Sequence, residues 1–204
     1  MACGLALLAS GQAFATTYAS SANIVANDLT SPTNWKYSNC AGSAASTISI
    51  MNEDAVTICP THTLNLSTND TLDAYMLVFN TGSWAGSGLK FGPVGTGFDK
   101  MIMNQSGSAM TITSLDLSAM DIGNKITITE QAFSGLGKTV TFTNVVGKSL
   151  SCTPSGGSAA AYSPGTPIAV GTICAVVAAA VNNSVSAPIF STKEKPAVFS
   201  EEVK

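Results

Sequence analysis

The amino-acid sequence predicts an all-β protein that folds as an antiparallel β-sandwich with local disulfides. Segments rich in β-branched and aromatic residues recur along the chain between Gly, Asn and Pro, as strands separated by turns do. Two of them, residues 125–129 and 139–143, alternate apolar residues with threonines, which buries one face of a strand and exposes the other. Charged residues make up only 10% of the chain, so Ser, Thr, Asn and Gly must provide the polar surface. These residues suit strands and turns.

Seven segments of the chain carry strand signals. They are residues 46–51, 55–59, 73–79, 100–103, 109–118, 125–130 and 139–145. In the fifth segment the apolar alternation slips by one position between Ile112 and Leu115. A β-bulge near Thr113 and Ser114 is the simplest explanation, because an extra residue restores the buried face.

The remaining segments are assigned from their composition. Residues 174–181 suit a buried final strand better than a helix, because they combine valines with a cysteine. Residues 80–97 and 154–167 are rich in Gly and Ser, which predicts loops. No convincing amphipathic helix and no exact internal repeat occur in the sequence.

One main domain fits a chain of 204 residues. Residues 1–15 contain a short apolar run and end in Ala-Phe-Ala, which predicts a signal peptide cleaved before Thr16. No lysine precedes Lys36, so the alternative is an uncleaved apolar arm. The run is too short to span a bilayer. We therefore expect a single β-sandwich domain over 16–187, followed by a charged tail over 188–204, and no transmembrane span.

The cysteines predict two disulfides. One of the five cysteines lies within the first fifteen residues. An even number in an exported chain indicates disulfide pairing. Three pairings are possible, and we favour Cys40–Cys59 with Cys152–Cys174 because each closes a local loop. A loop of that size contributes about 3 kcal/mol in the chain-entropy model.

A phosphate-binding motif is matched loosely by Ala132–Thr139, with Ala in place of the first Gly. Such a loop works between a strand and a helix, where backbone N–H groups and the helix dipole face the phosphates. Here alternating strands lie on both sides. We therefore expect a β-hairpin corner with Gly135 and Gly137 in the turn, an exposed Lys138, and no nucleotide binding.

The sequence offers no recognisable catalytic constellation. His62 is the only histidine, and no nucleophile elbow accompanies it, so a hydrogen-bonded structural role is expected. No pair of carboxylates stands out for glycoside hydrolysis. Asn69, Asp70 and Asp73 do not follow the spacing of a calcium loop and are expected in a turn. We expect no enzyme, no metal and no cofactor.

Aromatic residues are the remaining candidates for ligand binding. Trp35 and Tyr37 precede the first disulfide, and Trp84 lies in a glycine-rich segment where it either stacks on a sugar ring or covers the end of the sandwich. In the tail, Val198 and Phe199 alternate as in a short strand. They are the candidates for docking against an exposed sheet edge during assembly.

Two stretches resemble bacterial secreted immunoglobulin-like modules. The first is Phe91-Gly-Pro-Val-Gly-Thr-Gly, and the second runs from Met103-Asn-Gln-Ser-Gly through Met110-Thr-Ile-Thr-Ser to Leu115. The resemblance covers about a quarter of the chain. It implies an immunoglobulin-like or jelly-roll-like sandwich of adhesive or structural use, and it carries over no functional residue.

These observations favour a non-catalytic structural or adhesive protein that is extracellular or on the cell surface, with the periplasm as an alternative. It would be a subunit of a fibre, a surface layer or a coat, associating with itself or with other surface proteins, because a low charge lets copies pack. A carbohydrate-binding module, with a glycan as partner, and a virion coat protein stay open as alternatives. The chain has no arginine and no basic cluster before residue 193, so nucleic acid is not an expected partner.

Overall fold

A computed structural model describes residues 16–25, 29–51, 54–95, 99–106, 109–129 and 138–179. Within these ranges every regular element is a β-strand, apart from one short 3-10 helix, η1 (Pro32–Asn34), so the predicted all-β class is confirmed. The strands are β1 (Thr17–Ser20), β2 (Trp35–Tyr37), β3 (Ala55–Ile58), β4 (Thr63–Leu64), β5 (Thr71–Leu72), β6 (Met76–Phe79), β7 (Ser83–Trp84), β8 (Leu89–Phe91), β9 (Lys100–Asn104), β10 (Met110–Ile112), β11 (Leu115–Asp116), β12 (Lys125–Thr129), β13 (Thr139–Phe142), β14 (Val145–Val146), β15 (Ser149–Thr153), β16 (Ala160–Ala161), β17 (Pro167–Ala169) and β18 (Ile173–Val177).

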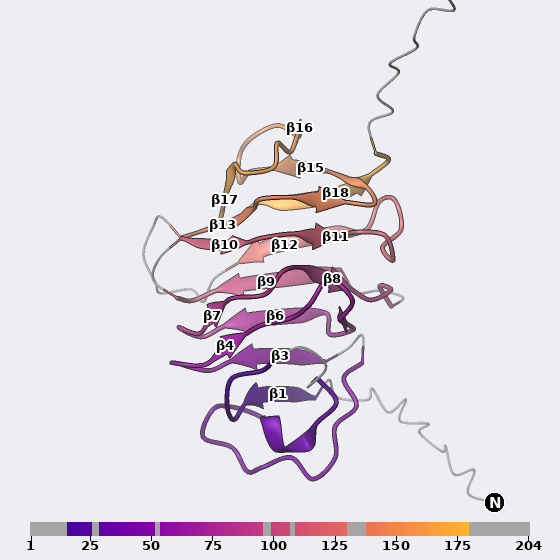
Figure 1. Cartoon of the computed structure of the whole chain (residues 1–204). Helices are drawn as coiled ribbons and strands as arrows, with labels where there is room; N and C mark the ends of the chain where they lie inside the picture. Colours follow the sequence, from indigo (N-terminus) through magenta and orange to yellow (C-terminus); the bar gives the residue numbers. More distant parts are fainter. Residues whose placement is uncertain are drawn as a thin grey trace, which may run out of the picture.

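The strands from β3 to β14 wind into a parallel β-helix of four coils, each with three strands (Figure 1). On the first face β3, β6, β9 and β12 pair in parallel, and on the second face β5, β8, β11 and β14 do the same. The third face holds β4, β7, β10 and β13, of which only β4–β7 and β10–β13 are paired. Strands three apart in the sequence are thus neighbours in space.

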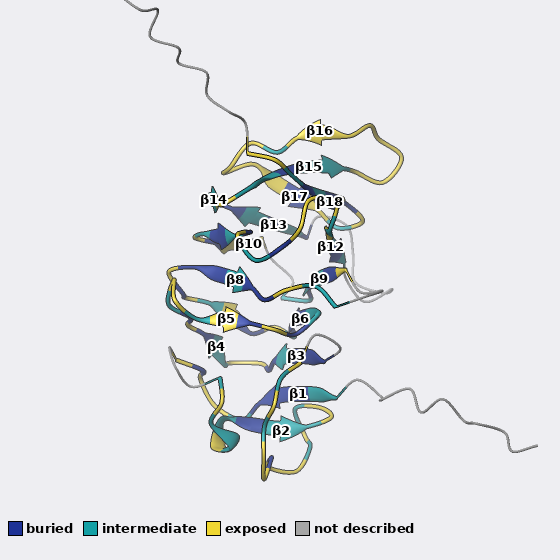
Figure 2. Cartoon of the chain, turned by 90° about the vertical axis from the view of Figure 1, so that its right-hand side faces the viewer, coloured by how far each residue is buried: buried dark blue, intermediate teal, exposed yellow. Residues whose placement is uncertain are grey.

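The interior of the helix is a set of stacked apolar side chains. On the first face Val56, Leu77, Ile102 and Ile128 lie in register in successive coils, and all four are fully buried. Burial of such a side chain is worth about 1.5–3 kcal/mol. Each coil therefore needs its neighbours to bury its inward face, as in other repeat architectures. Buried residues lie along the strands throughout the stack (Figure 2).

The antiparallel sandwich expected from the sequence is corrected by this pairing. A coil of a β-helix and a strand of a sandwich both place every second side chain inside, so the two folds give the same alternation. Only long-range pairing distinguishes them. The successive coils differ in length and share no repeated sequence, which hides their period.

Two local predictions are corrected for the same reason. No bulge absorbs the slip at Thr113 and Ser114, because the chain turns a corner there between β10 on the third face and β11 on the second. Met110 and Leu117 are both buried, so the corner keeps both apolar pairs inside. The expected hairpin corner with Gly135 and Gly137 lies outside the described residues. The two described strands that would form the hairpin, β12 and β13, belong to different sheets and do not pair.

Three other segments differ from or refine the expectations. Residues 46–51 form no strand, and the carbonyl group of Thr47 accepts a hydrogen bond from the Tyr37 hydroxyl. The expected loop over 80–97 contains β7 and β8, whereas 154–167 is a loop apart from β16 and the first residue of β17. In 174–181 the favoured strand is confirmed as β18 up to Val177.

Both ends of the β-helix are closed by caps in which strands run antiparallel. At the start β1 pairs in parallel with β3 and antiparallel with β2. At the end β18 pairs antiparallel with both β12 and β15, β16 with β15, and β17 with β13. The reversal of strand direction ends the coiling. Residues 1–15, 130–137 and 180–204 lie outside the described residues, and with them the predicted signal peptide and tail.

Candidate functional site

The two predicted disulfides are confirmed, and each belongs to one cap. Cys40–Cys59 joins the loop after β2 to the end of β3, and Cys152–Cys174 joins the paired strands β15 and β18. Their Cα atoms are 5.7 Å and 3.9 Å apart, respectively. The covalent bonds thus lie at the two ends of the stack.

Of the aromatic candidates, Trp35 and Tyr37 serve the N-terminal cap. Trp35 is fully buried, and its Nε1 donates a hydrogen bond to the carbonyl of Leu29 at 3.1 Å, so it offers no ring face to a ligand. The Tyr37 hydroxyl donates to the Thr47 carbonyl at 2.9 Å. The hydroxyl of Thr47, helped by that of Ser46 and by the Thr47 backbone N–H, lowers the pKa of Tyr37 to about 8.

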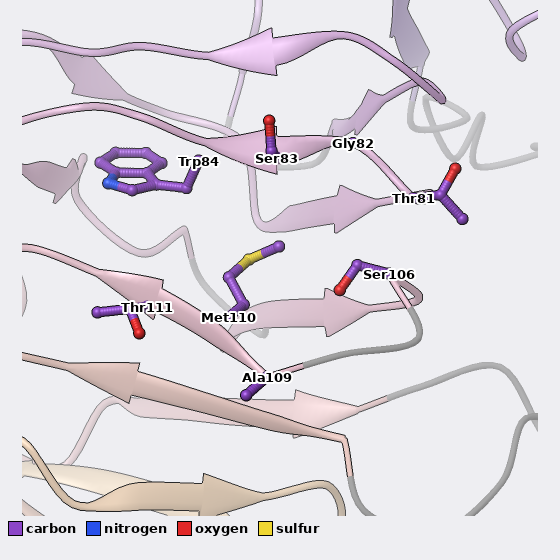
Figure 3. Close-up of a pocket in the computed structure, with 8 residues that line it drawn as sticks. All are labelled: Thr81, Gly82, Ser83, Trp84, Ser106, Ala109, Met110 and Thr111. Carbon is purple, nitrogen blue, oxygen red and sulfur yellow. The ribbon is translucent and has the colours of Figure 1, made fainter.

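The third candidate, Trp84, lines a groove of about 240 Å³ on the third face, between β7 and β10 (Figure 3). Four hydroxyl-bearing residues also line the groove, namely Thr81, Ser83, Ser106 and Thr111. The Ser83 hydroxyl oxygen lies 3.0 Å from Thr63 Oγ1 on the neighbouring strand β4. The indole of Trp84 and the thioether of Met110 provide its apolar surface. No charged side chain from the described part of the chain lines the groove. The structure therefore combines one aromatic ring with an uncharged polar rim.

The groove exists because the parallel ladder is interrupted on this face. The second and third coils pair on the other two faces, through β6–β9 and β8–β11, but β7 and β10 share no pairing. The backbone N–H groups of Ser83 and Ala85 donate to the carbonyls of His62 and Leu64 on the preceding coil, each at 3.0 Å. Because alternate residues of a strand face opposite neighbours, Trp84 directs its backbone N–H and C=O toward β10.

The other side of the groove follows the same alternation. Thr143 N–H donates to the carbonyl of Ile112 at 3.0 Å, so Ile112 faces the fourth coil and Thr111 directs its backbone groups toward β7. No backbone hydrogen bond joins β7 and β10 in the described part of either strand. One side chain bridges the end of the gap, where Thr113 Oγ1 donates to the Gly86 carbonyl at 3.2 Å.

Close packing fixes the position of the Trp84 ring. Trp84 lies in register with Leu64 of the coil below, and its Nε1 donates to the Gly86 carbonyl at 3.0 Å. A Cβ at Gly86 would lie 2.7 Å from Cζ2 of the indole, and one at Gly82 would lie 2.6 Å from Cγ2 of Ile58. A residue with a Cβ does not fit at either glycine position without a shift of its neighbours. The packing therefore fixes the Trp84 ring in the protein alone.

A buried asparagine, which sequence reasoning missed, orders the rim of the groove. Asn104 is fully buried, and its Nδ2 donates to the Thr139 carbonyl at 2.9 Å. Its Oδ1 accepts the Ser106 backbone N–H at 3.0 Å and the Ser106 hydroxyl at 2.6 Å. Asn104 is therefore a positioning residue for Ser106. The only available signal was an amide residue ending an apolar strand, which is typical of turns.

His62 has the structural role expected from the sequence. Its Nδ1 lies 2.8 Å from the hydroxyl oxygen of Ser20, which is fully buried and accepts the Cys59 backbone N–H at 2.9 Å. The serine hydroxyl is therefore used to join β1 to the end of β3. A buried hydroxyl in this position does not meet a substrate.

The carboxylates are likewise used in turns. Asp54, Asp70 and Asp116 each accept the backbone N–H of a residue two or three positions away, at 2.8 Å. Partial burial disfavours the charged form of Asp116. Hydrogen bonds from Ser118 and the nearby ammonium groups of Lys90 and Lys148 outweigh burial and lower the pKa of Asp116.

Two further features of the described residues bear on the site. These residues contain no group of three or more His, Cys, Asp or Glu that is arranged to hold a metal ion. None of their helices has the length and apolar character that a membrane span requires. A second cavity of about 420 Å³ lies in the C-terminal cap, where Pro154, Ala161, Tyr162 and Ile168 give it a mostly apolar lining.

Comparisons with protein-family models, with curated proteins and with solved structures returned no match. The resemblance to immunoglobulin-like modules therefore stays a prediction.

Proposed function

We propose that this chain is an exported, non-catalytic structural or adhesive protein that forms a subunit of an extracellular assembly. The observation that carries the proposal is the pair of disulfide-bonded caps that close the two ends of the β-helix. Disulfides persist in oxidising compartments, outside the cytoplasm. A short rod whose two ends are closed by disulfides is suited to such a compartment. A structural role of this kind requires no active site.

The arrangement of the caps also favours one mode of assembly. Unpaired strand edges at the ends of a β-helix would invite end-to-end growth, and here the caps end in short edge strands, β2 with three residues and β16 with two, which discourage it. The sides of the rod carry outward threonines, such as Thr111 and Thr141, which lie in register on adjacent coils. An uncharged surface of this kind packs against copies of itself without charge repulsion. The proposal is therefore lateral association of rods.

The side chains that could act in catalysis are engaged in structural hydrogen bonds, which supports the non-catalytic part of the proposal. Ser20 and His62 form a pair with a buried hydroxyl, and Asp54, Asp70 and Asp116 hold backbone N–H groups. A catalytic acid, base or nucleophile must reach a substrate. These groups instead stabilise turns and the N-terminal cap.

Electron microscopy of the purified native material, with light scattering over a range of concentrations, tests the proposal. Fibres or sheets are expected, with Thr127→Glu weakening assembly because it places a charge on the outward face of β12. Ile122→Glu is the matched control, since it adds the same charge at an exposed turn. Particles with the mass of one chain at every concentration would contradict the proposal.

A carbohydrate-binding module is the second candidate, and one observation favours it. A row of exposed aromatic rings is absent from the described residues, because Trp35 is buried and the Tyr37 hydroxyl is held by Thr47. Trp84, however, borders the groove between β7 and β10. That single ring supports one binding subsite, not an extended platform.

A further inference from the structure

The groove between β7 and β10 offers two kinds of surface within one small space. Trp84 and Met110 give an apolar surface, and the hydroxyl-bearing residues Thr81, Ser106 and Thr111 line the same groove (Figure 3). Binding sites for small molecules combine an apolar or aromatic surface with a few placed polar groups in this way. Aromatic rings with polar surroundings suit ligands that have both an apolar face and hydroxyl groups.

The interrupted ladder adds hydrogen-bonding groups of the backbone to this surface. Trp84 and Thr111 direct their N–H and C=O groups into the groove from opposite sides. Backbone groups strongly require hydrogen-bond partners, and a ligand with several hydroxyls supplies both donors and acceptors. The break in the sheet thus forms a polar recognition surface that a paired sheet lacks.

The size and charge of the groove narrow the ligand class. Its volume of about 240 Å³ equals that of about eight water molecules, which suits one pyranose ring. Among the residues that the structure describes, none with a charged side chain lines the groove, so they supply no counter-ion for a carboxylate, sulfate or phosphate. We propose that the groove binds one residue of a neutral saccharide, with the apolar face of the sugar on Trp84 and its hydroxyls bonded to the rim.

The groove is preorganised for such a ligand. The hydrogen bond from Trp84 Nε1 to Gly86, together with the missing space for a Cβ at Gly82 and Gly86, fixes the ring. Asn104 fixes Ser106 on the rim. A surface ordered before binding loses little conformational entropy on binding. The inference does not rest on the proposed assembly, because Trp84 and Met110 line the groove in the single chain.

Tryptophan fluorescence tests the proposal directly, because the chain has only two tryptophans. Trp35 is fully buried, and Trp84 is partly exposed beside the groove. Acrylamide should therefore quench Trp84 selectively. Maltotetraose, cellotetraose, mannotetraose and N-acetylchitotetraose are the neutral probes, and tetragalacturonate is the anionic one. At least one neutral probe should protect Trp84, with a dissociation constant on the order of 1 mM for a single ring.

Variants locate the binding by calorimetry or by ligand-observed NMR. Thr111→Val removes a rim hydroxyl and should weaken binding about fivefold, the cost of one hydrogen bond. Thr141→Val is the matched control, because Thr141 lies in register on the next coil and outside the groove, and it should leave binding unchanged. Trp84→Phe keeps an aromatic ring over Leu64, and it should weaken binding and abolish the protected fluorescence signal.

Three outcomes would overturn the proposal. The first is that no neutral probe binds. The second is equal binding by the wild type, Thr111→Val and Trp84→Phe, which would place the ligand elsewhere. The third is tighter binding of tetragalacturonate than of every neutral probe, which would exclude the neutral class.

Discussion

Ile102 gives the sharpest test of the parallel β-helix. Its side chain is fully buried in the third coil, in register with Leu77 below and Ile128 above. Ile→Ala substitutions in cores cost 2–5 kcal/mol, and the cost is highest where the site cannot collapse. Strands that are hydrogen-bonded on both sides hold the cavity open, so Ile102→Ala should lower the free energy of unfolding by about 4 kcal/mol.

Urea denaturation followed by far-ultraviolet circular dichroism measures this loss. Met101→Ala is the matched control, because Met101 is the neighbouring residue of the same strand but points outward and is only half-buried. Its loss should stay below about 1 kcal/mol, as for most surface substitutions. Nearly equal losses for the two variants would refute the inward position of Ile102.

A double-mutant cycle then tests the stacking itself. Leu77→Ala and Ile102→Ala should interact by about 0.5–3 kcal/mol, because side chains in contact share a cavity. The two residues are distant in the sequence, and they meet only through the β6–β9 pairing. Leu77 and Ile168 form the control pair, since β17 lies beyond β13 at the far end of the stack. Additive losses of unfolding free energy for Leu77→Ala and Ile102→Ala would contradict the stacking of neighbouring coils.

The remaining predictions concern the groove, a tyrosine and a cap. Gly86→Ala should lower the free energy of unfolding, measured by urea denaturation, by about 1–3 kcal/mol through overpacking, and it should shift the Trp84 emission. Gly157→Ala is the control and should leave the free energy of unfolding nearly unchanged, because its added methyl meets nothing closer than 3.4 Å. One phenol should titrate near pH 8 by phenolate absorbance, and this step should be missing in Tyr37→Phe. A wild-type titration curve without a step near pH 8 would contradict this prediction. Replacing Cys152 and Cys174 together by Ala should cost about 3 kcal/mol in the chain-entropy model, and an unchanged unfolding midpoint would show that the bond is dispensable.

Local chemistry made part of this structure predictable. The strands over 125–129 and 139–142 follow from the alternation of apolar residues with threonine. The two disulfides follow from the even number of cysteines after residue 15 and from the short loops that they close. The role of His62 follows from the absence of catalytic partners. Each of these inferences needs only the residue and its neighbours in the sequence.

The coiled path was not predictable from the same signals. Leu77 and Ile102 become neighbours through a long connection, and nothing in either strand specifies whether its partner runs parallel or antiparallel. The groove depends on the same missing information. Trp84 stands out in the sequence, but its partial exposure results from the unpaired edge between β7 and β10, which only the stacking order produces.

Two lysines show a further limit of sequence reasoning. Lys138 was expected at an exposed turn, and the structure buries it almost completely. Lys100 is also buried, where its Nζ donates to the carbonyls of Asp73 and Ala74 at 2.7 Å and 3.2 Å and lies 5.6 Å from the centre of the Phe91 ring. Charged residues are rarely buried unless they are paired. The carbonyl groups of Asp73 and Ala74 supply such partners for Lys100, and a sequence does not reveal them.

The position of the disulfides has a consequence for how long this protein persists. A stack whose units contact only their neighbours loses structure from its ends, where a terminal unit has one neighbour instead of two. Cys40–Cys59 and Cys152–Cys174 close those two ends covalently. Fraying is the event that exposes backbone to proteases, so blocking it at both ends slows degradation even if the interior coils are only moderately stable. In a reducing environment the same rod would become vulnerable from both ends at once.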